Sequence, residues 1–158
     1  MWRHGDWVTL TDDYAMMVHG RSDATLNRNG VRMGSLDIYR ALETVSDVTE
    51  SLVVGVERPD GGYWMPLFVS LAEGAVLDDR LRSAIRSAIR DGASPRHLPD
   101  DIIEIDSVPH TLTGKKLEIP VKRILQGQQP ADVVDLGAVD HPEVLEHIAA
   151  HAAMRSPA

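Results

Sequence analysis

Short runs in which apolar and polar residues alternate occupy the first part of the chain, and they predict two β-hairpins. Trp7–Thr11 would pair with Tyr14–His19 across an Asp-Asp turn, and Thr25–Arg28 would pair with Val31–Met33 across Asn29-Gly30. Asn-Gly favours a two-residue hairpin turn because both residues tolerate positive φ. Two strands alone are marginal in water, so the first hairpin is expected to belong to a larger structure.

A helical repeat of apolar residues follows the hairpins. Ser35 is expected to cap a helix whose apolar positions are Leu36, Tyr39, Leu42 and Val45, spaced at three-residue intervals. Such spacing places these side chains on one face of a helix, which we expect to be buried.

Three further helices are predicted along the chain. One would begin at Asp78 or Asp79, carry an apolar stripe, and end at Ser94-Pro95. Another would cover Pro120–Leu125 with a proline in its first turn, and the last would run from His141 to about Ala153. The apolar stripe of the first of these predicts that it packs on a sheet or on another helix.

Strands are predicted between the helices, without a regular βαβ rhythm. Leu52–Glu57 and Tyr63–Leu71 would be joined by a Pro-Asp-Gly-Gly turn, and Asp101–Ile105 would form a short strand. Residues Gln126 to Gly137 are expected to be irregular. The pattern favours an α+β fold, a small mixed sheet flanked by helices and preceded by β-hairpins, over a doubly wound sheet.

Composition narrows the function classes. The 158 residues are 43% hydrophobic and 25% charged, as in ordinary soluble domains, and no apolar run approaches the roughly 18–20 residues of a membrane span. A net charge of −8 argues against nucleic-acid binding. The absence of cysteine excludes disulfides, thiol catalysis and zinc-thiolate sites. These features and the polar N-terminus, which has no signal-peptide core, predict a cytoplasmic protein.

Charge is distributed unevenly near the C-terminus. Residues 128–158 carry five acidic side chains against Arg155, whereas residues 107–127 carry four basic side chains against Glu118. A basic segment on an acidic protein predicts contact with a small phosphorylated ligand rather than with a polyanion.

Local motifs alone identify candidate chemistry only weakly. The segment Thr-Leu-Thr-Gly-Lys-Lys at 111–116 would present a lysine beyond a tight turn, but Pro109 and Lys116 occupy positions where a Walker A motif requires Gly and Ser/Thr. A solvated loop is the ordinary interpretation of such a tip. His147 and His151 have the spacing of two metal ligands on a helix, yet no third ligand is evident, and we predict no metal site.

Four motifs taken in order carry a much more specific signal. They are Gly5-Asp6, Gly-Arg-Ser-Asp at 20–23, Asn-Gly-Val-Arg-Met-Gly at 29–34, and Thr-x-Thr-Gly-Lys at 111–115. Together they resemble the C-terminal part of adenylate-forming acyl-CoA synthetases over almost the whole chain. The longer strings at 2–7, 20–28 and 112–123 resemble the acetoacetate-activating branch of that family in particular.

The resemblance implies a two-step ligase in which a carboxylate and Mg²⁺-ATP give an acyl-adenylate, which CoA then converts to a thioester and AMP. In this family the C-terminal domain is a lid that rotates between the steps. By motif position, Asp6 and Arg21 would bind the nucleotide near its ribose, and Arg32 would approach the ATP phosphates. Lys115, rather than the adjacent Lys116, would bridge the substrate carboxylate and the α-phosphate.

The remaining assignments concern the hinge and CoA. Asp23 would be the hinge residue, and the Asn29-Gly30 turn would line the pantetheine tunnel. Arg86 would contact a CoA phosphate, although Arg90 lies one turn away on the same predicted helix. The cofactors implied are ATP, Mg²⁺ and coenzyme A, and the implied carboxylate is acetoacetate.

The resemblance also implies a division of the chain. Residues 1–20 would belong to a large N-terminal domain, 21–24 would be the hinge, 25–127 the lid, and 128–158 an acidic tail. The chain lacks the Ser/Thr/Gly-rich loop that cradles ATP in this family, so we expect it to be a partial enzyme that is inactive alone. The alternatives are the lid of another short-chain acyl-CoA ligase and a non-catalytic interaction module that docks through its acidic tail.

Overall fold

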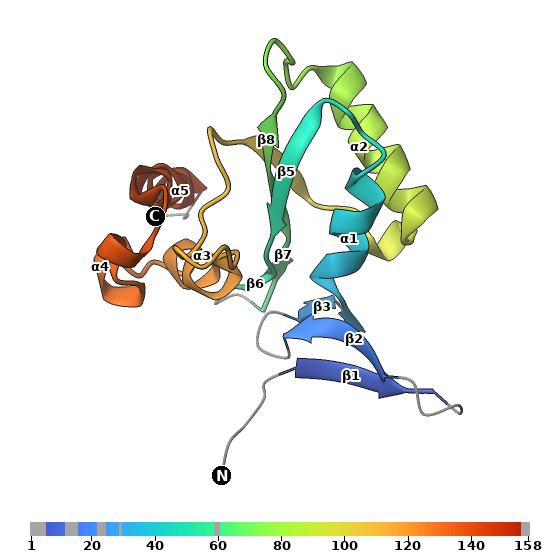
Figure 1. Cartoon of the computed structure of the whole chain (residues 1–158), viewed down its shortest axis with the longest axis horizontal. Coiled ribbons are helices and arrows are strands. Elements are labelled where there is room, and N and C mark those ends of the chain that lie inside the picture. Colours follow the sequence, from blue (N-terminus) through green and yellow to red (C-terminus); the bar gives the residue numbers. More distant parts are fainter. Residues whose placement is uncertain (1–5, 12–15, 22–24, 29, 59–60, 156–158) are drawn as a thin grey trace.

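A three-stranded mixed sheet lies at the centre of the fold (Figure 1). Strand β5 (Val48–Val53) pairs antiparallel with β8 (Pro66–Leu71), and β8 pairs parallel with β9 (Asp101–Glu104). The computed structural model describes residues 6–11, 16–21, 25–28, 30–58 and 61–155.

Helices cover both faces of this sheet. In Figure 1, α1 (Ser35–Leu42) and α2 (Asp79–Gly92) lie on one side of it, and α3 (Glu118–Leu125) and α5 (Pro142–Arg155) lie on the other. The remaining short elements are α4 (Pro130–Val133) and two 3₁₀ turns, η1 (Pro95–His97) and η2 (Leu136–Ala138). The α+β prediction is therefore confirmed, including its small mixed sheet and flanking helices.

Strand periodicity divides the buried residues into two cores. Leu52, Phe68 and Ile103 join the core beneath α3 and α5, whereas their sequence neighbours in the same strands join the core beneath α1 and α2. Successive side chains of a strand point to opposite faces, so each strand serves both cores. The centre of β8 is fully buried, because helices cover both sides of it.

Both hairpins are present. Strand β1 (Asp6–Leu10) pairs antiparallel with β2 (Met16–Arg21), and β3 (Leu26–Arg28) pairs antiparallel with β4 (Val31–Met33). Gly30 has φ 79°, the left-handed conformation that glycine adopts without strain. The turn residues Asp12 and Asp13 lie outside the described residues.

The first helix differs from its prediction by one residue. Gly34, in extended conformation, is the N-cap, and Ser35 is the first helical residue. The fully buried face consequently contains Ile38 and Leu42, while Leu36 and Tyr39 are only partly buried. In the second helix the ambiguity is resolved, because the Asp78 side chain accepts a hydrogen bond from the Leu81 N–H at 2.8 Å.

The two long predicted strands are each interrupted. The chain forms β5, then β6 (Val56–Glu57), β7 (Tyr63–Trp64) and finally β8. The break falls at Gly55, over which the Tyr63 side chain lies: a Cβ built on Gly55 would be 1.7 Å from the Tyr63 hydroxyl oxygen. That hydroxyl accepts a hydrogen bond from the Asn27 N–H at 2.9 Å and so ties the β3–β4 hairpin to the rest of the fold.

We expect Gly55→Ala to lower the free energy of unfolding by about 1–2 kcal/mol, because Tyr63 must move and leave the Asn27 N–H without its partner. Chemical denaturation followed by circular dichroism measures this loss. The same substitution in a Tyr63→Ala background, which removes the side chain that lies over Gly55, separates the steric clash from the general cost of replacing glycine. Equal losses from Gly55→Ala in the two backgrounds would show that Tyr63 does not require the space over Gly55.

The segment predicted to be irregular after the third helix contains ordered turns. Pro130 opens α4, and the Asp135 side chain accepts a hydrogen bond from the Gly137 N–H at 3.0 Å within η2. The prediction was wrong there because each element is shorter than the window in which a helical repeat can be recognised. The third helix itself begins at Glu118, two residues before the predicted start.

Candidate functional site

The predicted lysine lies on a tight hairpin loop formed by residues 110–116. His110 and Lys116 form an antiparallel bridge, the Thr111 N–H donates to the Lys115 carbonyl at 2.8 Å, and the Gly114 N–H donates to the Thr111 carbonyl at 2.8 Å. The turn requires a positive φ at Gly114, which is 80°. The Thr111 hydroxyl also accepts from the Lys115 N–H at 3.1 Å. The backbone of Lys115 is therefore held on both sides.

The two adjacent lysines have opposite surroundings. Lys115 is exposed, whereas the Lys116 ammonium donates to the Ser51 carbonyl at 2.7 Å and lies 3.9 Å from the centre of the Tyr39 ring. Burial lowers the pKa of Lys116, although the carboxylates of Glu50 and Glu118 oppose that effect. Of this pair, only Lys115 presents its charge to solvent.

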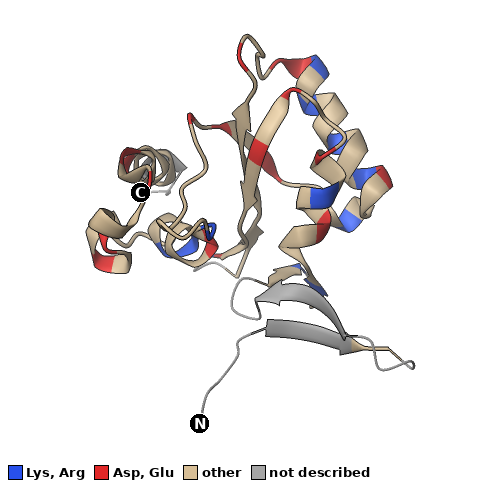
Figure 2. Ribbon diagram, in the orientation of Figure 1, with Lys and Arg blue, Asp and Glu red and all other residues tan. Residues whose placement is uncertain are grey.

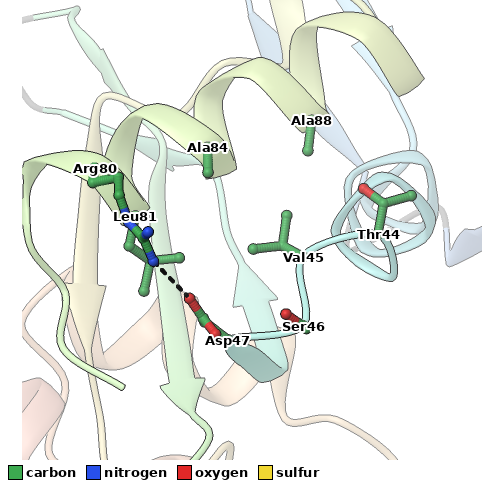
Figure 3. Close-up of a pocket in the computed structure, with 8 residues that line it drawn as sticks. All are labelled: Thr44, Val45, Ser46, Asp47, Arg80, Leu81, Ala84 and Ala88. Atoms are coloured by element: carbon green, nitrogen blue, oxygen red, sulfur yellow. Dashed lines mark ion pairs between the residues drawn. The ribbon is translucent and has the colours of Figure 1, made fainter. Parts of the chain in front are cut away.

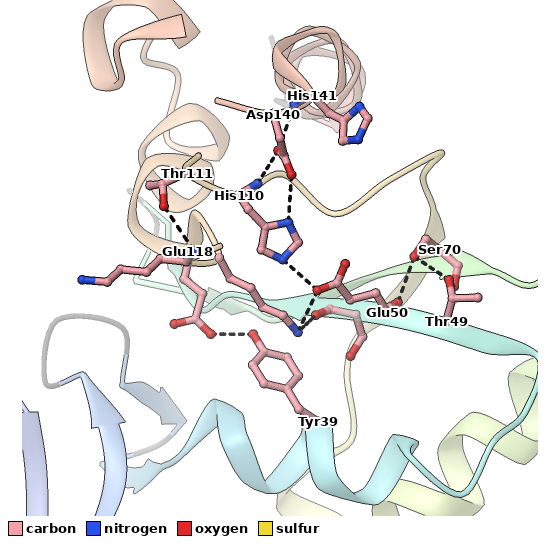
Figure 4. A network of polar contacts seen from close by, with 12 residues as sticks. Tyr39, Thr49, Glu50, Ser70, His110, Thr111, Glu118, Asp140 and His141 are labelled. Carbon is pink, nitrogen blue, oxygen red and sulfur yellow. Dashed lines mark hydrogen bonds and ion pairs between the residues drawn. The ribbon is translucent and has the colours of Figure 1, made fainter. Parts of the chain in front are cut away.

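A polar network lies beneath the loop (Figure 4). The Tyr39 hydroxyl donates to Glu118 Oε1 at 2.5 Å and accepts from the Val53 N–H at 3.2 Å. Burial, reinforced by the Glu118 charge, raises the pKa of Tyr39 well above its ordinary value. Glu50 Oε1 lies 2.7 Å from His110 Nε2 and 3.8 Å from Lys116 Nζ, so it contacts both end residues of the loop.

The C-terminal segment holds the base of the same loop. Asp140 Oδ1 accepts from the N–H groups of His110 and His141, both at 2.8 Å, and Asp140 Oδ2 lies 3.3 Å from His110 Nδ1. The Leu112 N–H donates to the Ala138 carbonyl at 3.0 Å. Desolvation alone would raise the pKa of Asp140, but the two backbone N–H groups and the neighbouring imidazoles lower it overall.

The lowered pKa of Asp140 gives a stability contribution with a defined pH dependence. A carboxyl whose pKa is lowered by folding stabilises the fold above its unfolded-state pKa, near 3.8, and loses that contribution as pH falls through the folded value. We therefore expect the difference in unfolding free energy between the wild type and Asp140→Asn to be larger near pH 5 and to shrink below pH 4. Urea denaturation across that range measures it, and a difference that grows toward acid would contradict it.

The β3–β4 hairpin, whose turn is expected to line a CoA tunnel, also carries Arg32. Arg32 is exposed on β4, and Asn29 lies outside the described residues. Strand β3 is fixed by Arg28, whose guanidinium lies 2.5 Å from Asp100 Oδ1 and donates to the Leu98 carbonyl at 2.7 Å. The exposed Arg32 therefore projects from an anchored hairpin.

The other predicted nucleotide residues lie on the first hairpin. Asp6 and Arg21 are opposite each other in the β1–β2 register, so the fold brings these two backbone positions together. Asp23, the predicted hinge, lies outside the described residues.

Basic residues gather along α2 (Figure 2). Arg86 is half-buried and its Nη1 donates to the Pro99 carbonyl at 3.1 Å, whereas Arg90, one turn later, is exposed. By contrast, two of the four basic side chains predicted at 107–127 are held by other groups, while Lys115 and Arg123 are exposed. Lys116 is held beneath the loop, and Lys122 lies 2.8 Å from Glu57 Oε2. Desolvation would raise the pKa of Glu57, but Lys122 lowers it overall.

A cavity of about 410 Å³ lies between α2 and the loop that joins α1 to β5 (Figure 3). Arg80 and Asp47 approach to 3.9 Å at one end, and the small side chains of Ala84 and Ala88 line the other. None of the predicted site residues whose side chains the structure describes lines it.

Sequence patterns alone did not identify Glu50, His110 and Asp140. Their mutual contacts span 60 and 30 residues of sequence, and no motif links them.

Within the described ranges there is no group of three or more His, Cys, Asp or Glu side chains arranged to hold a metal ion. No described helix combines the length and apolarity needed to cross a bilayer.

Comparison with known proteins identifies a family domain and relatives that agree with each other. Residues 38–115 match the family described as AMP-binding enzyme C-terminal domain. The chain is 40% identical over 146 residues to acetoacetyl-coenzyme A synthetase of Rhizobium meliloti, and 40% identical over 147 residues to that of Mus musculus. Each match covers 92% of this chain but only 22% and 21% of the relative, so the chain spans about a fifth of the length of these relatives.

Comparison with solved structures gives the same kind of relative. Acetoacetyl-CoA synthetase from Streptomyces lividans superposes with a TM-score of 0.89 at 52% identity, covering 98% of this chain and 23% of that one. The amide bond synthetase McbA from Marinactinospora thermotolerans superposes with a TM-score of 0.64 at 27% identity, covering 77% of this chain and 24% of that one. The similarity to the first of these includes the C-terminal segment as well as the family domain.

Proposed function

Residues 38–115 of this chain belong to the AMP-binding enzyme C-terminal domains, and from that premise we propose that the chain acts as the lid of an ATP-dependent acid–CoA ligase. The observation that carries the proposal is the pairing of an exposed Lys115 on a rigid turn with a buried Lys116. A charge that must meet a substrate anion has to be exposed and carried on a positioned backbone, and Lys115 is exposed on a turn whose backbone is held by hydrogen bonds.

The proposed reaction has two steps: the carboxylate first displaces pyrophosphate from ATP, and CoA then displaces AMP from the acyl-adenylate. A carboxylate oxygen bonds to the α-phosphorus of ATP, and the bond from that phosphorus to the pyrophosphate oxygen breaks. The thiol sulfur of CoA then bonds to the acyl carbon, the bond from that carbon to the AMP oxygen breaks, and the thiol proton is lost to solvent. Mg²⁺ would enter with ATP as part of the substrate. Lys115 would stabilise the charge that builds between the carboxylate and the α-phosphoryl group in the first step.

The remaining residues would act around this centre. Arg32, exposed on β4, would meet the ATP phosphates, because a guanidinium offers several donors in one plane. Asp6 and Arg21 would contact the nucleotide near its ribose. Asp23 would be the hinge on which the lid turns between the two steps.

The proposed CoA contacts lie on two elements. The Asn29-Gly30 turn would line the pantetheine tunnel, since Gly30 lets the backbone approach a ligand closely. On α2 we propose Arg86 as the phosphate contact, because a guanidinium has five N–H donors and the bond to the Pro99 carbonyl holds it at one of its nitrogens. Arg90 is the matched comparison, because it is exposed on the same helix.

We propose acetoacetate as the acid. The relatives at 40% and 52% identity are named for acetoacetyl-CoA, and their similarity extends through the C-terminal segment. The proposed division assigns residues 25–127 to the lid, 21–24 to the hinge, and 1–20 to a preceding large domain that would supply the carboxylate pocket. Docking through the acidic tail has less support, because the tail helix α5 buries its apolar side chains in this chain's own core.

Release of AMP from ATP, acetoacetate and CoA tests the proposal. The chain would be assayed alone, then with the upstream part of the Rhizobium meliloti relative added in trans, and then joined to that part in one chimera. We expect turnover only when the upstream part is present. Turnover by the chain alone would contradict the lid proposal, and a chimera that prefers another short-chain acid would replace acetoacetate with that acid.

A further inference from the structure

We propose that the C-terminal segment positions the lysine loop, with Asp140 acting on Lys115 through His110. The proposal rests on the proposed function, because it assumes that Lys115 meets the substrate. The C-terminal clamp is defined here as residues 138–140, which are the last residue of η2 and the two that follow it, shortly before α5. These residues are outside the matched family domain, which ends at residue 115.

The clamp grips the loop at consecutive residues. Thr111 pairs with Val139 in an antiparallel bridge, the Leu112 N–H donates to the Ala138 carbonyl, and the Asp140 N–H donates to the His110 carbonyl at 3.1 Å. The clamp therefore adds a strand-like partner to the outer side of the loop. Without it, the Leu112 N–H and the His110 carbonyl would lose these backbone partners, and the outer side of the loop would be unsupported.

The Asp140 carboxylate fixes the first residue of the loop in two ways. One oxygen accepts from the backbone N–H of His110, and the other lies 3.3 Å from its Nδ1. On the opposite side of the ring, Glu50 of β5 lies 2.7 Å from Nε2. The imidazole is thus held between a carboxylate of the central sheet and a carboxylate of the clamp (Figure 4).

The position of the His110 imidazole affects the position of Lys115 in the loop. His110 bridges to Lys116, and Thr111 exchanges a backbone hydrogen bond with Lys115, so a shift at the base of the turn moves its tip. A displacement on the order of 1 Å can lower a reaction rate by about 100-fold when two groups must be closely aligned. Asp140 is therefore assigned as a positioning residue, since it does not itself face the loop tip.

The test compares Asp140→Ala with Asp140→Asn in the chimera described above, and Asp132→Ala is the control, an exposed aspartate of the same segment. Acyl-adenylate formation is followed by pyrophosphate exchange, and the second step by thioester formation from supplied acetoacetyl-adenylate. We expect Asp140→Ala to slow adenylation by about 10–100-fold while changing thioester formation by less than about twofold. Asp140→Asn should recover part of the loss, because its amide oxygen still accepts the two N–H groups. Asp132→Ala should behave as the wild type.

Amide hydrogen exchange on this chain alone is a second test, and it does not depend on catalysis. We expect exchange at Leu112 to become about tenfold faster in Asp140→Ala and to stay unchanged in Asp132→Ala. Unchanged exchange at Leu112, or equal losses in the two half-reactions, would overturn the positioning role. If Lys115→Ala adenylates as the wild type does, the proposed role of Lys115 fails instead, whatever the exchange data show.

Discussion

Replacing Lys115 by alanine is expected to slow acyl-adenylate formation by on the order of 100–1000-fold, which is the usual loss when one preorganised donor to a developing charge is removed. The lysine is exposed at the tip of a turn whose backbone is fixed by hydrogen bonds from Thr111 and Gly114. The turn would therefore bring the ammonium to the α-phosphoryl group without rearrangement of the loop backbone. Pyrophosphate exchange in the chimera with the upstream part of a relative measures the effect.

The second half-reaction provides the internal control for Lys115→Ala. Thioester formation from supplied acetoacetyl-adenylate has no phosphoryl transfer, and on the proposed lid rotation Lys115 is withdrawn from the centre by then. We expect that rate to remain measurable and close to that of the wild type. A variant that loses both half-reactions equally would place Lys115 in structure or in general substrate binding rather than in adenylation.

Lys116→Ala is the matched control at the neighbouring position. Lys116 donates to the Ser51 carbonyl and stacks on Tyr39, so its removal should lower the free energy of unfolding by about 1–2 kcal/mol. Adenylation should fall much less than in Lys115→Ala. If Lys116→Ala instead abolished adenylation and Lys115→Ala did not, the two lysines would exchange their assigned roles.

The sequence predicted best the features that depend on neighbouring residues. A turn at Asn29-Gly30 needs positive φ, and Gly30 adopts it. Asp78 was a candidate helix cap because a short acidic side chain can reach the Leu81 N–H three residues later, and it does. The loop at 111–115 was recognised for the same reason, since Gly114 permits a turn that leaves the next side chain exposed.

Features that depend on distant residues could not be predicted in this way. Whether Lys115 or Lys116 is buried depends on Ser51 and Tyr39, more than 60 residues away in the sequence. The interruption at Gly55 depends on where the Tyr63 ring lies. The clamp around His110 depends on Glu50 and Asp140, which come from opposite sides of the loop in the chain. Charge counting likewise could not show that Lys122 is paired with Glu57.

The packing of α5 gives the second large expected effect. Leu145→Ala should lower the free energy of unfolding by about 3 kcal/mol, because Leu145 is fully buried and its removal leaves a cavity. Its side chain belongs to the same core as Leu52, Phe68 and Val121, which come from the sheet and α3. Urea denaturation followed by tryptophan fluorescence and by circular dichroism measures the loss, with Trp64 of that same core as one of the reporters.

Glu146→Ala is the control for the same helix, because Glu146 is the exposed neighbour of Leu145 and its loss should change stability by less than about 0.5 kcal/mol. A helix that shares a core with the sheet must unfold with it, so we expect one cooperative transition by both probes. If Leu145→Ala and Glu146→Ala were equally stable, α5 would not pack on this core in solution and its apolar face would be free for a partner. A large loss confined to Leu145→Ala would instead make α5 part of the lid, which the C-terminal clamp requires, because α5 follows the clamp directly and fixes its far end.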